Sequence, residues 1–123
     1  MAWSRTCLLI LLLISSTRAS TSVAQGMLEQ RLSEPVLLGL DSKKQIAELE
    51  YCVANAITAT TGVPQGAYRD GDERVVIFSN RIAEVKVFLA VTLTKTISGT
   101  KIEVRGRNEK AIFGFQEVLG KCI

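Results

Sequence analysis

The sequence predicts an α+β domain, a two-layer sandwich in which two helices cover one face of three or four antiparallel strands. Three observations predict it. Apolar residues recur at helical spacing in 43–61 and 109–122, and the segments between them alternate as strands do. The two cysteines that follow Cys7, Cys52 and Cys122, fall one in each helix. Both helices then bury their apolar sides most economically on the same face of the sheet, joined by a disulfide.

Residues 1–24 have the layout of a secretory signal peptide. A short positive start is followed by the apolar run Cys7–Ile14, which is too short to span a membrane, since a span needs about 20 apolar residues. Cleavage fits after Ala24, which we prefer, or after Ala19. We therefore expect a secreted or periplasmic protein with no stable membrane insertion once the signal peptide is removed. The chain has no Asn-x-Ser/Thr site, which favours a bacterial source.

The charge balance bears on the class of partner. The chain carries 15 Lys and Arg against 12 Asp and Glu, and removal of Arg5 and Arg18 with the signal peptide leaves a net charge near +1. A net charge this small gives no indication of binding to nucleic acid or to an anionic membrane. A domain this small buries only about 60–70% of its unfolded surface, so a covalent bond would matter for its stability. In an oxidising compartment, Cys52 and Cys122 are expected to pair.

Residues 25–40 are expected to be a linker or flexible N-terminal arm, and 41–123 a single α+β domain. Pro35 breaks any helix that begins nearby, although 36–38 could form a short edge strand. Asp41 or Ser42 suits the N-cap position of the first helix. That helix ends before Gly62 and Pro64. Its apolar row consists of Ile46, Leu49, Val53, Ala56 and Ile57.

Three or four strands are expected between the helices. Asp70-Gly71 is a hairpin signal that would pair a short strand at 67–69 with the β-branched segment 74–79. The clearest strand is 84–95, and 100–105 returns beside it. Strict alternation along 84–95 would place on one face Val85, Val87, Leu89, Val91 and Leu93, and on the other Phe88 and Ala90. Asn108 then caps the last helix, whose buried row is expected to be Ala111, Phe115, Val118 and Cys122.

A resemblance can be stated on short motifs spread over most of the chain after the leader. They are Cys52-Val53-Ala54, Gly66-Ala67-Tyr68, Ile102–Arg105 and the closing Cys122-Ile123. With its leader, this pattern resembles small secreted or periplasmic bacterial proteins of unassigned function. The resemblance implies export and a structural disulfide, and it brings no catalytic residue.

The residue types present argue against an enzyme. The chain has no histidine, which excludes Ser-His and Cys-His nucleophilic systems and removes the commonest metal ligand. Asp70, Asp72 and Glu73 crowd one turn, but they lack the further ligands of an EF-hand loop, so we expect a solvated turn. Neither a metal nor a cofactor is expected.

The candidate contact residues are Arg105, Arg107, Lys110 and, if it is exposed, Tyr68. The first three lie where a strand is expected to end and a helix to begin. Helix N-termini bind anions through free N–H groups and the helix dipole. Two hypotheses follow. The preferred one is a protein-binding module with an unknown envelope or extracellular partner; the alternative is a binder of a small anionic ligand at Arg105–Lys110.

Overall fold

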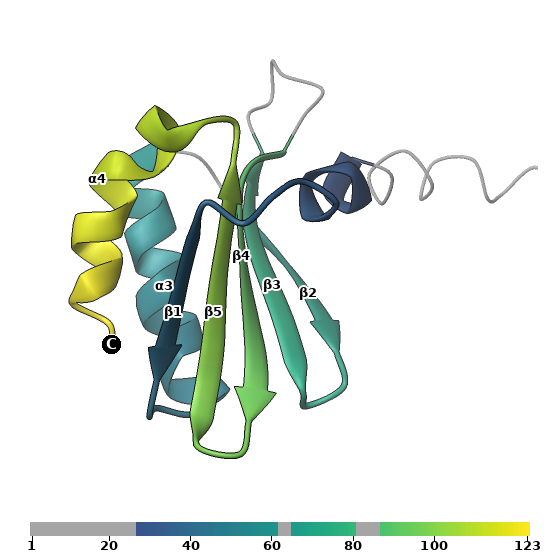
Figure 1. Ribbon diagram of the computed structural model, residues 1–123, viewed down its shortest axis with the longest axis vertical. Coiled ribbons are helices and arrows are strands. Elements are labelled where there is room, and N and C mark those ends of the chain that lie inside the picture. The colour runs from purple at the N-terminus through teal and green to yellow at the C-terminus, as the bar shows by residue number, and fades with distance from the viewer. Residues whose placement is uncertain (1–26, 62–64, 81–86) are drawn as a thin grey trace, which may run out of the picture.

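The computed structural model describes residues 27–61, 65–80 and 87–123. The expected signal peptide and both cleavage sites lie outside these residues. One antiparallel sheet has the strand order β1-β5-β4-β3-β2, and Figure 1 shows it with the helices on one side. The strands are β1 (Leu38–Ser42), β2 (Gln65–Asp70), β3 (Arg74–Asn80), β4 (Val87–Thr96) and β5 (Gly99–Gly106), and the helices are α3 (Ile46–Thr61) and α4 (Glu109–Gly120).

The sheet has five strands, not the three or four that the sequence predicts. The additional strand is β1, an edge strand that begins at Leu38, where the possible edge strand 36–38 is expected to end. It pairs antiparallel with β5 and places Leu38 opposite Val104 and Leu40 opposite Ile102. Leu38 and Leu40 therefore pack against the main core between the sheet and the helices. Strand β1 is too short for its alternation to be distinctive, and the residues expected to cap the first helix are its last two. The helix α3 then joins the two opposite edges of the sheet, because β2 follows it in the chain.

The first helix begins at Ile46, four residues after the position expected for its cap. Glu48 accepts a hydrogen bond from the backbone N–H of Gln45 through Oε2 at 2.8 Å. This hydrogen bond is one half of a capping box, with Gln45 at the N-cap and Glu48 at the third helical position. Ser42 is engaged elsewhere, since its Oγ accepts a hydrogen bond from the N–H of Lys44 at 3.1 Å. The predicted N-cap at Asp41 or Ser42 is therefore wrong.

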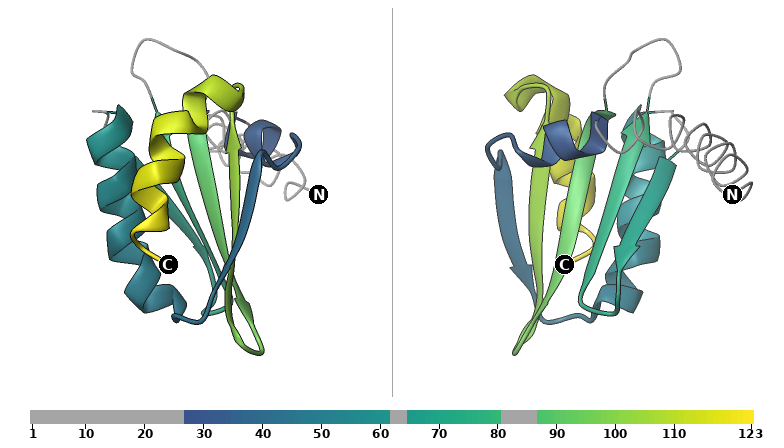
Figure 2. Two further views of the ribbon diagram at one scale, coloured as in Figure 1. Left: turned by 60° about the vertical axis from the view of Figure 1, so that its left-hand side comes forward. Right: turned by 90° about the vertical axis from the view of Figure 1, so that its right-hand side faces the viewer.

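Both helices lie on the same face of the sheet (Figure 2, left), and the disulfide joins Cys52 of α3 to Cys122, with Cα atoms 5.7 Å apart. The expected row of α3 is buried as a whole. Helix α4 ends at Gly120, so Cys122 lies in the turn that follows it and not within the helix. The main core is formed by apolar residues of the helices and of the sheet face that they cover, including Leu49, Val53, Ile57, Val75, Ile77, Leu89, Val91, Leu93, Ile102, Val104, Phe115 and Leu119.

The alternation expected for the central strand is interrupted at Phe88. Ser79 pairs with Leu89, but the next residue of β3, Asn80, pairs with Val87, so Phe88 is the additional residue of an irregular step. Phe88 packs against the main core and Val87 joins a separate cluster. The prediction that Val87 shares the face of Leu89 is therefore wrong, and Val85 lies outside the described residues.

The second face of the sheet is partly covered by the helical turn 27–32. Leu28 packs there with Val76, Val87 and Ala90. Arg31 is also buried, and its Nε donates a hydrogen bond to the carbonyl oxygen of Val87 at 2.7 Å. The stretch expected as a linker or arm thus contributes this turn and most of β1, and the rest of the second face carries polar side chains.

Candidate functional site

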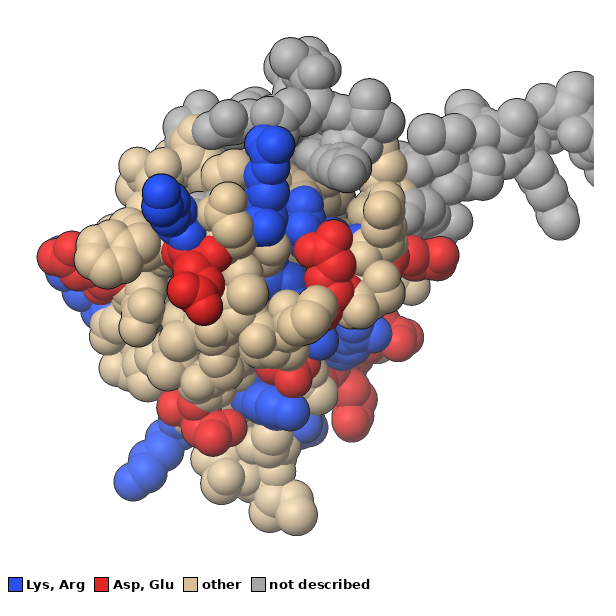
Figure 3. All heavy atoms as spheres, turned by 45° about the horizontal axis from the view of Figure 1, so that its top comes forward, with Lys and Arg blue, Asp and Glu red and all other residues tan. Residues whose placement is uncertain are grey.

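The strand-to-helix junction does not gather the three basic residues that the sequence placed there. Strand β5 ends at Gly106 and α4 begins at Glu109. Arg107 and Lys110 extend from this end of the molecule, whereas Arg105 lies lower, on the second face of the sheet. On the side of the molecule seen in Figure 3, basic side chains alternate with acidic ones and form no patch of one sign.

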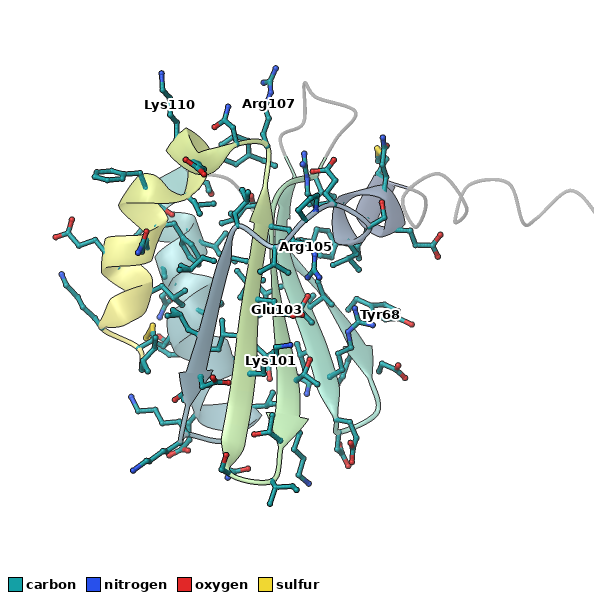
Figure 4. All side chains as sticks on the ribbon, viewed as in Figure 1. Tyr68, Lys101, Glu103, Arg105, Arg107 and Lys110 are labelled. Atoms are coloured by element: carbon teal, nitrogen blue, oxygen red, sulfur yellow. A yellow bond between two sulfur atoms is a disulfide. The ribbon has the colours of Figure 1, made fainter. Side chains whose placement is uncertain are left out.

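Strand alternation explains where Arg105 goes. On β5 the buried residues Ile102 and Val104 point to the main core, so the residues on either side of them point to the opposite face. These are Lys101, Glu103 and Arg105, and Figure 4 shows all three on the second face with Tyr68 of β2 toward the other edge. We call these four residues the polar face.

Sheet register connects the polar face across four strands. Tyr68 pairs with Val76, Val76 pairs with Thr92, and Thr92 pairs with Glu103. Residues that are directly opposite on neighbouring antiparallel strands have side chains on the same face and in contact range. One row of side chains therefore runs from the exposed aromatic ring of Tyr68 to the carboxylate of Glu103, over buried Val76 and Thr92.

Three charges of alternating sign form a ladder along β5. Lys101 Nζ lies 3.0 Å from Glu103 Oε1, and Arg105 Nη1 lies 3.7 Å from Glu103 Oε2. Side-chain exposure falls along the ladder from 54% for Lys101 to 22% for Glu103 and 15% for Arg105. Lys101 is therefore the most exposed end of the ladder, and Arg105 its most buried end.

Glu103 is held in its ionised form by these neighbours. The hydrogen bond from Lys101 lowers the pKa of the Glu103 carboxyl, burial opposes this effect, and the positive charges of Lys101 and Arg105 lower the pKa further. The carboxylate therefore stays an acceptor at neutral pH. A general acid or base needs a pKa near the operating pH, so this shift disfavours such a role for Glu103.

Arg105 has a second partner that fixes its direction. Its Nε donates a hydrogen bond to the backbone carbonyl oxygen of Glu34 at 3.1 Å. The side chain of Glu34 forms an ion pair with Arg31. A hydrogen bond thus joins the segment that follows the helical turn 27–32 to the Arg105 end of the ladder. Arg105 interacts with both Glu103 and Glu34.

Tyr68 stands at the edge of the sheet with 47% of its surface exposed. On the neighbouring row the ring of Phe78 lies over Gly66, where a Cβ would come within 2.6 Å of the ring. The absence of a side chain at Gly66 therefore leaves room for the ring of Phe78. The sequence identifies Tyr68 as a candidate contact residue but not Lys101 or Glu103, although the alternation of 100–105 directs both side chains away from the core.

The turn between β2 and β3 lies beside a shallow cavity of about 230 Å³, lined by Gln45, Ile46, Ala47, Arg69, Asp72 and Lys95. Within the described residues, no group of three or more Asp, Glu or Cys side chains is placed to hold a metal ion. Arg69 forms an ion pair with Glu50 of α3. Asp70, Asp72 and Glu73 are all exposed.

Nothing matches this chain among protein-family models, curated protein sequences or solved structures. The resemblance to small exported bacterial proteins accordingly stays a prediction. In the part of the chain that the structure describes, no helix is long and apolar enough to cross a membrane.

Proposed function

We propose that the chain is a small exported, non-enzymatic protein that binds another protein of the bacterial envelope or extracellular space through its polar face. The observation that carries the proposal is the row formed by exposed Tyr68 and the charge ladder of β5. Aromatic residues that combine apolar area with a hydroxyl group are enriched at protein interfaces. A row of fixed charges of both signs gives specificity for a partner with the complementary pattern.

The geometry of the ladder supports a protein partner over a small anion. Among the basic groups of the polar face, Arg105 is engaged by Glu103 and by the carbonyl oxygen of Glu34. An anion placed there would have to approach the ionised carboxylate of Glu103, which repels it. The alternative of an anion site at Arg105–Lys110 also lacks the shared location that it requires, because Arg105 lies apart from Arg107 and Lys110.

Photo-crosslinking at Lys101 tests the proposal. A photo-reactive amino acid replaces Lys101 in the full chain, which is expressed with its leader in the native host. The same amino acid at Lys121, an exposed residue beyond α4, is the control. We expect a specific protein adduct from position 101 that is absent from position 121. Adducts that are the same at both positions, or no adduct at 101, would contradict the proposal.

A charge substitution in the ladder gives an independent measurement. Glu103→Lys should abolish the adduct formed at position 101, because it removes the carboxylate of the ladder and places a positive charge beside Arg105. Glu117→Lys, on the exposed surface of α4, makes the same change in net charge and should leave the adduct intact. If both variants keep the adduct, recognition does not depend on the ladder.

A further inference from the structure

Strand β2 presents a regular and unprotected edge. It pairs on one side with β3 in an unbroken register from Gln65 to Asp70. Natural proteins usually block such edges with charged residues, proline or a bulge. Strand β2 has no proline and no bulge, and its charged residues are Arg69, which is paired with Glu50, and Asp70 at its end. Residues 67–70 are all exposed, and among the described elements none lies outside this edge (Figure 2, right). The outer backbone groups of β2 are therefore available to a further strand.

The side of α3 above this edge carries several small residues. Glu50 marks that side, because it reaches down to Arg69 on β2. On the side of Glu50 that faces away from the buried row, the residue three positions before it and those four, eight and eleven positions after it are small: Ala47, Ala54, Thr58 and Thr61. The exposed Tyr51 lies next to them. Thr58 and Thr61 donate their hydroxyl hydrogens to the carbonyl oxygens of Ala54 and Ile57, at 3.2 and 2.8 Å. Both hydroxyl groups therefore remain hydrogen-bonded to their own helix if an interface excludes water from this surface.

We propose that a second copy of this chain occupies the edge, with the two β2 strands paired antiparallel about a two-fold axis at Tyr68. Such an interface is isologous, so each copy supplies the strand that the other lacks. The two sheets become one, and the small side of one α3 faces that of the other. This inference goes beyond the proposed function, because it needs no other protein.

The side chains of β2 favour this register. With Tyr68 opposite Tyr68 of the second copy, the two rings form an aromatic cross-strand pair, a favourable arrangement in antiparallel sheets. Arg69 then lies opposite the small Ala67, and Asp70 opposite Gly66, so no like charges meet. A register centred on Arg69 would oppose two guanidinium groups. A register centred on Ala67 would bring Tyr68 onto Gly66, above which the ring of Phe78 already lies.

Sedimentation equilibrium of the secreted, disulfide-bonded protein tests the proposal over a wide range of concentration. We expect a reversible dimer for the natural chain. Tyr68→Lys should give a monomer, since two ammonium groups would face each other at the axis. Phe113→Lys is the matched control, because it also replaces an exposed aromatic residue with lysine but lies on α4, where Phe113 is 81% exposed. This variant should dimerise as the natural chain does.

Covalent trapping checks the register separately. Tyr68→Cys should give a disulfide-linked dimer under mild oxidation, because the two side chains lie opposite each other, and peptide mapping should show Cys52 still bonded to Cys122. A natural chain that stays monomeric at every concentration would overturn the proposal, as would a dimer that survives Tyr68→Lys. Trapping that fails in a chain that dimerises would place the interface elsewhere. A monomer that still gives the adduct at position 101 would leave the proposed function standing.

Discussion

Arg31 donates a hydrogen bond from Nε to the carbonyl oxygen of Val87, across 56 positions of the chain, at a distance of 2.7 Å. The same guanidinium forms an ion pair with Glu34, whose backbone carbonyl accepts the Nε hydrogen of Arg105. One buried side chain therefore links the helical turn 27–32 to the first residue of the central strand β4 and, through Glu34, to the Arg105 end of the charge ladder. Buried charges of this kind are tolerated only where each donor has a partner.

Arg31→Met tests this link. Methionine keeps much of the apolar stem of arginine, so the change mainly removes the hydrogen bond and the ion pair. We expect the free energy of unfolding to fall by about 1–3 kcal/mol, because the carbonyl oxygen of Val87 loses a buried donor. Chemical denaturation measures the loss. Gln30→Met, at the exposed neighbouring position, is the control and should change the stability little.

Hydrogen exchange shows whether the effect of Arg31→Met is local. Amide protons of the segment 27–37 should exchange faster in this variant, while those of α3 keep their protection. If the segment keeps its protection in Arg31→Met, the apolar contacts of Leu28 hold it and the hydrogen bond to Val87 contributes little.

The disulfide should contribute strongly to stability. Cys52 and Cys122 are 70 positions apart, and on the chain-entropy model a loop of this length destabilises the unfolded state by about 4 kcal/mol. Replacing both cysteines with serine should therefore lower Tm by roughly 15 °C or more for a domain of this size. Calorimetry of the double variant and of the natural protein measures the shift. A shift of only a degree or two would show that packing alone holds the two helices together.

The helices and their covalent link could be predicted from the sequence because their signals are local. The spacing of Ile46, Leu49 and Val53 defines one side of α3 without reference to any other part of the chain. The cysteines add one long-range constraint, and the structure confirms that they are bonded. The structure also confirms the α+β class, which rests on the same local signals of helical spacing and strand alternation.

The remainder depends on contacts between distant segments. Strand β1 forms because Leu38 and Leu40 pack against the core when β1 pairs with β5. Its five residues alternate too little for the sequence alone to define the bounds of the strand. The step at Phe88 depends on the pairing of β3 with β4. In the candidate site, Tyr68 was identified from its type alone. The ladder could not be predicted in this way, because alternation along β5 shows only which side chains point away from the core, whereas the ion pairs of Glu103 depend on side-chain positions in the folded sheet.

Gly99 is expected to tolerate no side chain. Its φ of 154° lies in a region that L-residues rarely adopt, and a Cβ there would come within 2.0 Å of the carbonyl oxygen of Ser42. The next residue fixes this close approach, since Thr100 Oγ1 donates to the carbonyl oxygen of Lys44 at 2.8 Å. Gly99→Ala should therefore cost about 3 kcal/mol or more, because backbone must move.

Gly39→Ala provides the comparison for Gly99→Ala. Gly39 lies on β1, and a Cβ there would meet no atom within 4 Å. The variant should be near neutral or slightly stabilising, because alanine restricts the unfolded chain more than glycine does. Urea denaturation of both variants measures the difference. Equal stability of the two would mean that the turn before β5 moves away from Ser42 at little cost.

The ladder should make the stability depend on pH in one direction. The pKa of Glu103 is lowered in the folded protein, mainly by the hydrogen bond from Lys101, so the folded state binds a proton less readily than the unfolded state. The stabilisation is present above the unfolded pKa of about 4.3 and is lost as the pH falls through the lower, folded value.

Denaturation of the natural protein and of Glu103→Gln between neutral and acid pH isolates this contribution. The natural protein should be the more stable at neutral pH, and the difference should shrink once the pH falls below about 4.3, since the carboxyl group then becomes protonated. Added salt should reduce the difference at neutral pH, because Lys101 is exposed and its charge is screened. Glu117→Gln, at an exposed position of α4, should follow the natural protein throughout. A difference that does not vary with pH would mean that Glu103 acts through packing and not through its charge, and the ladder would then lose its electrostatic basis as a recognition surface.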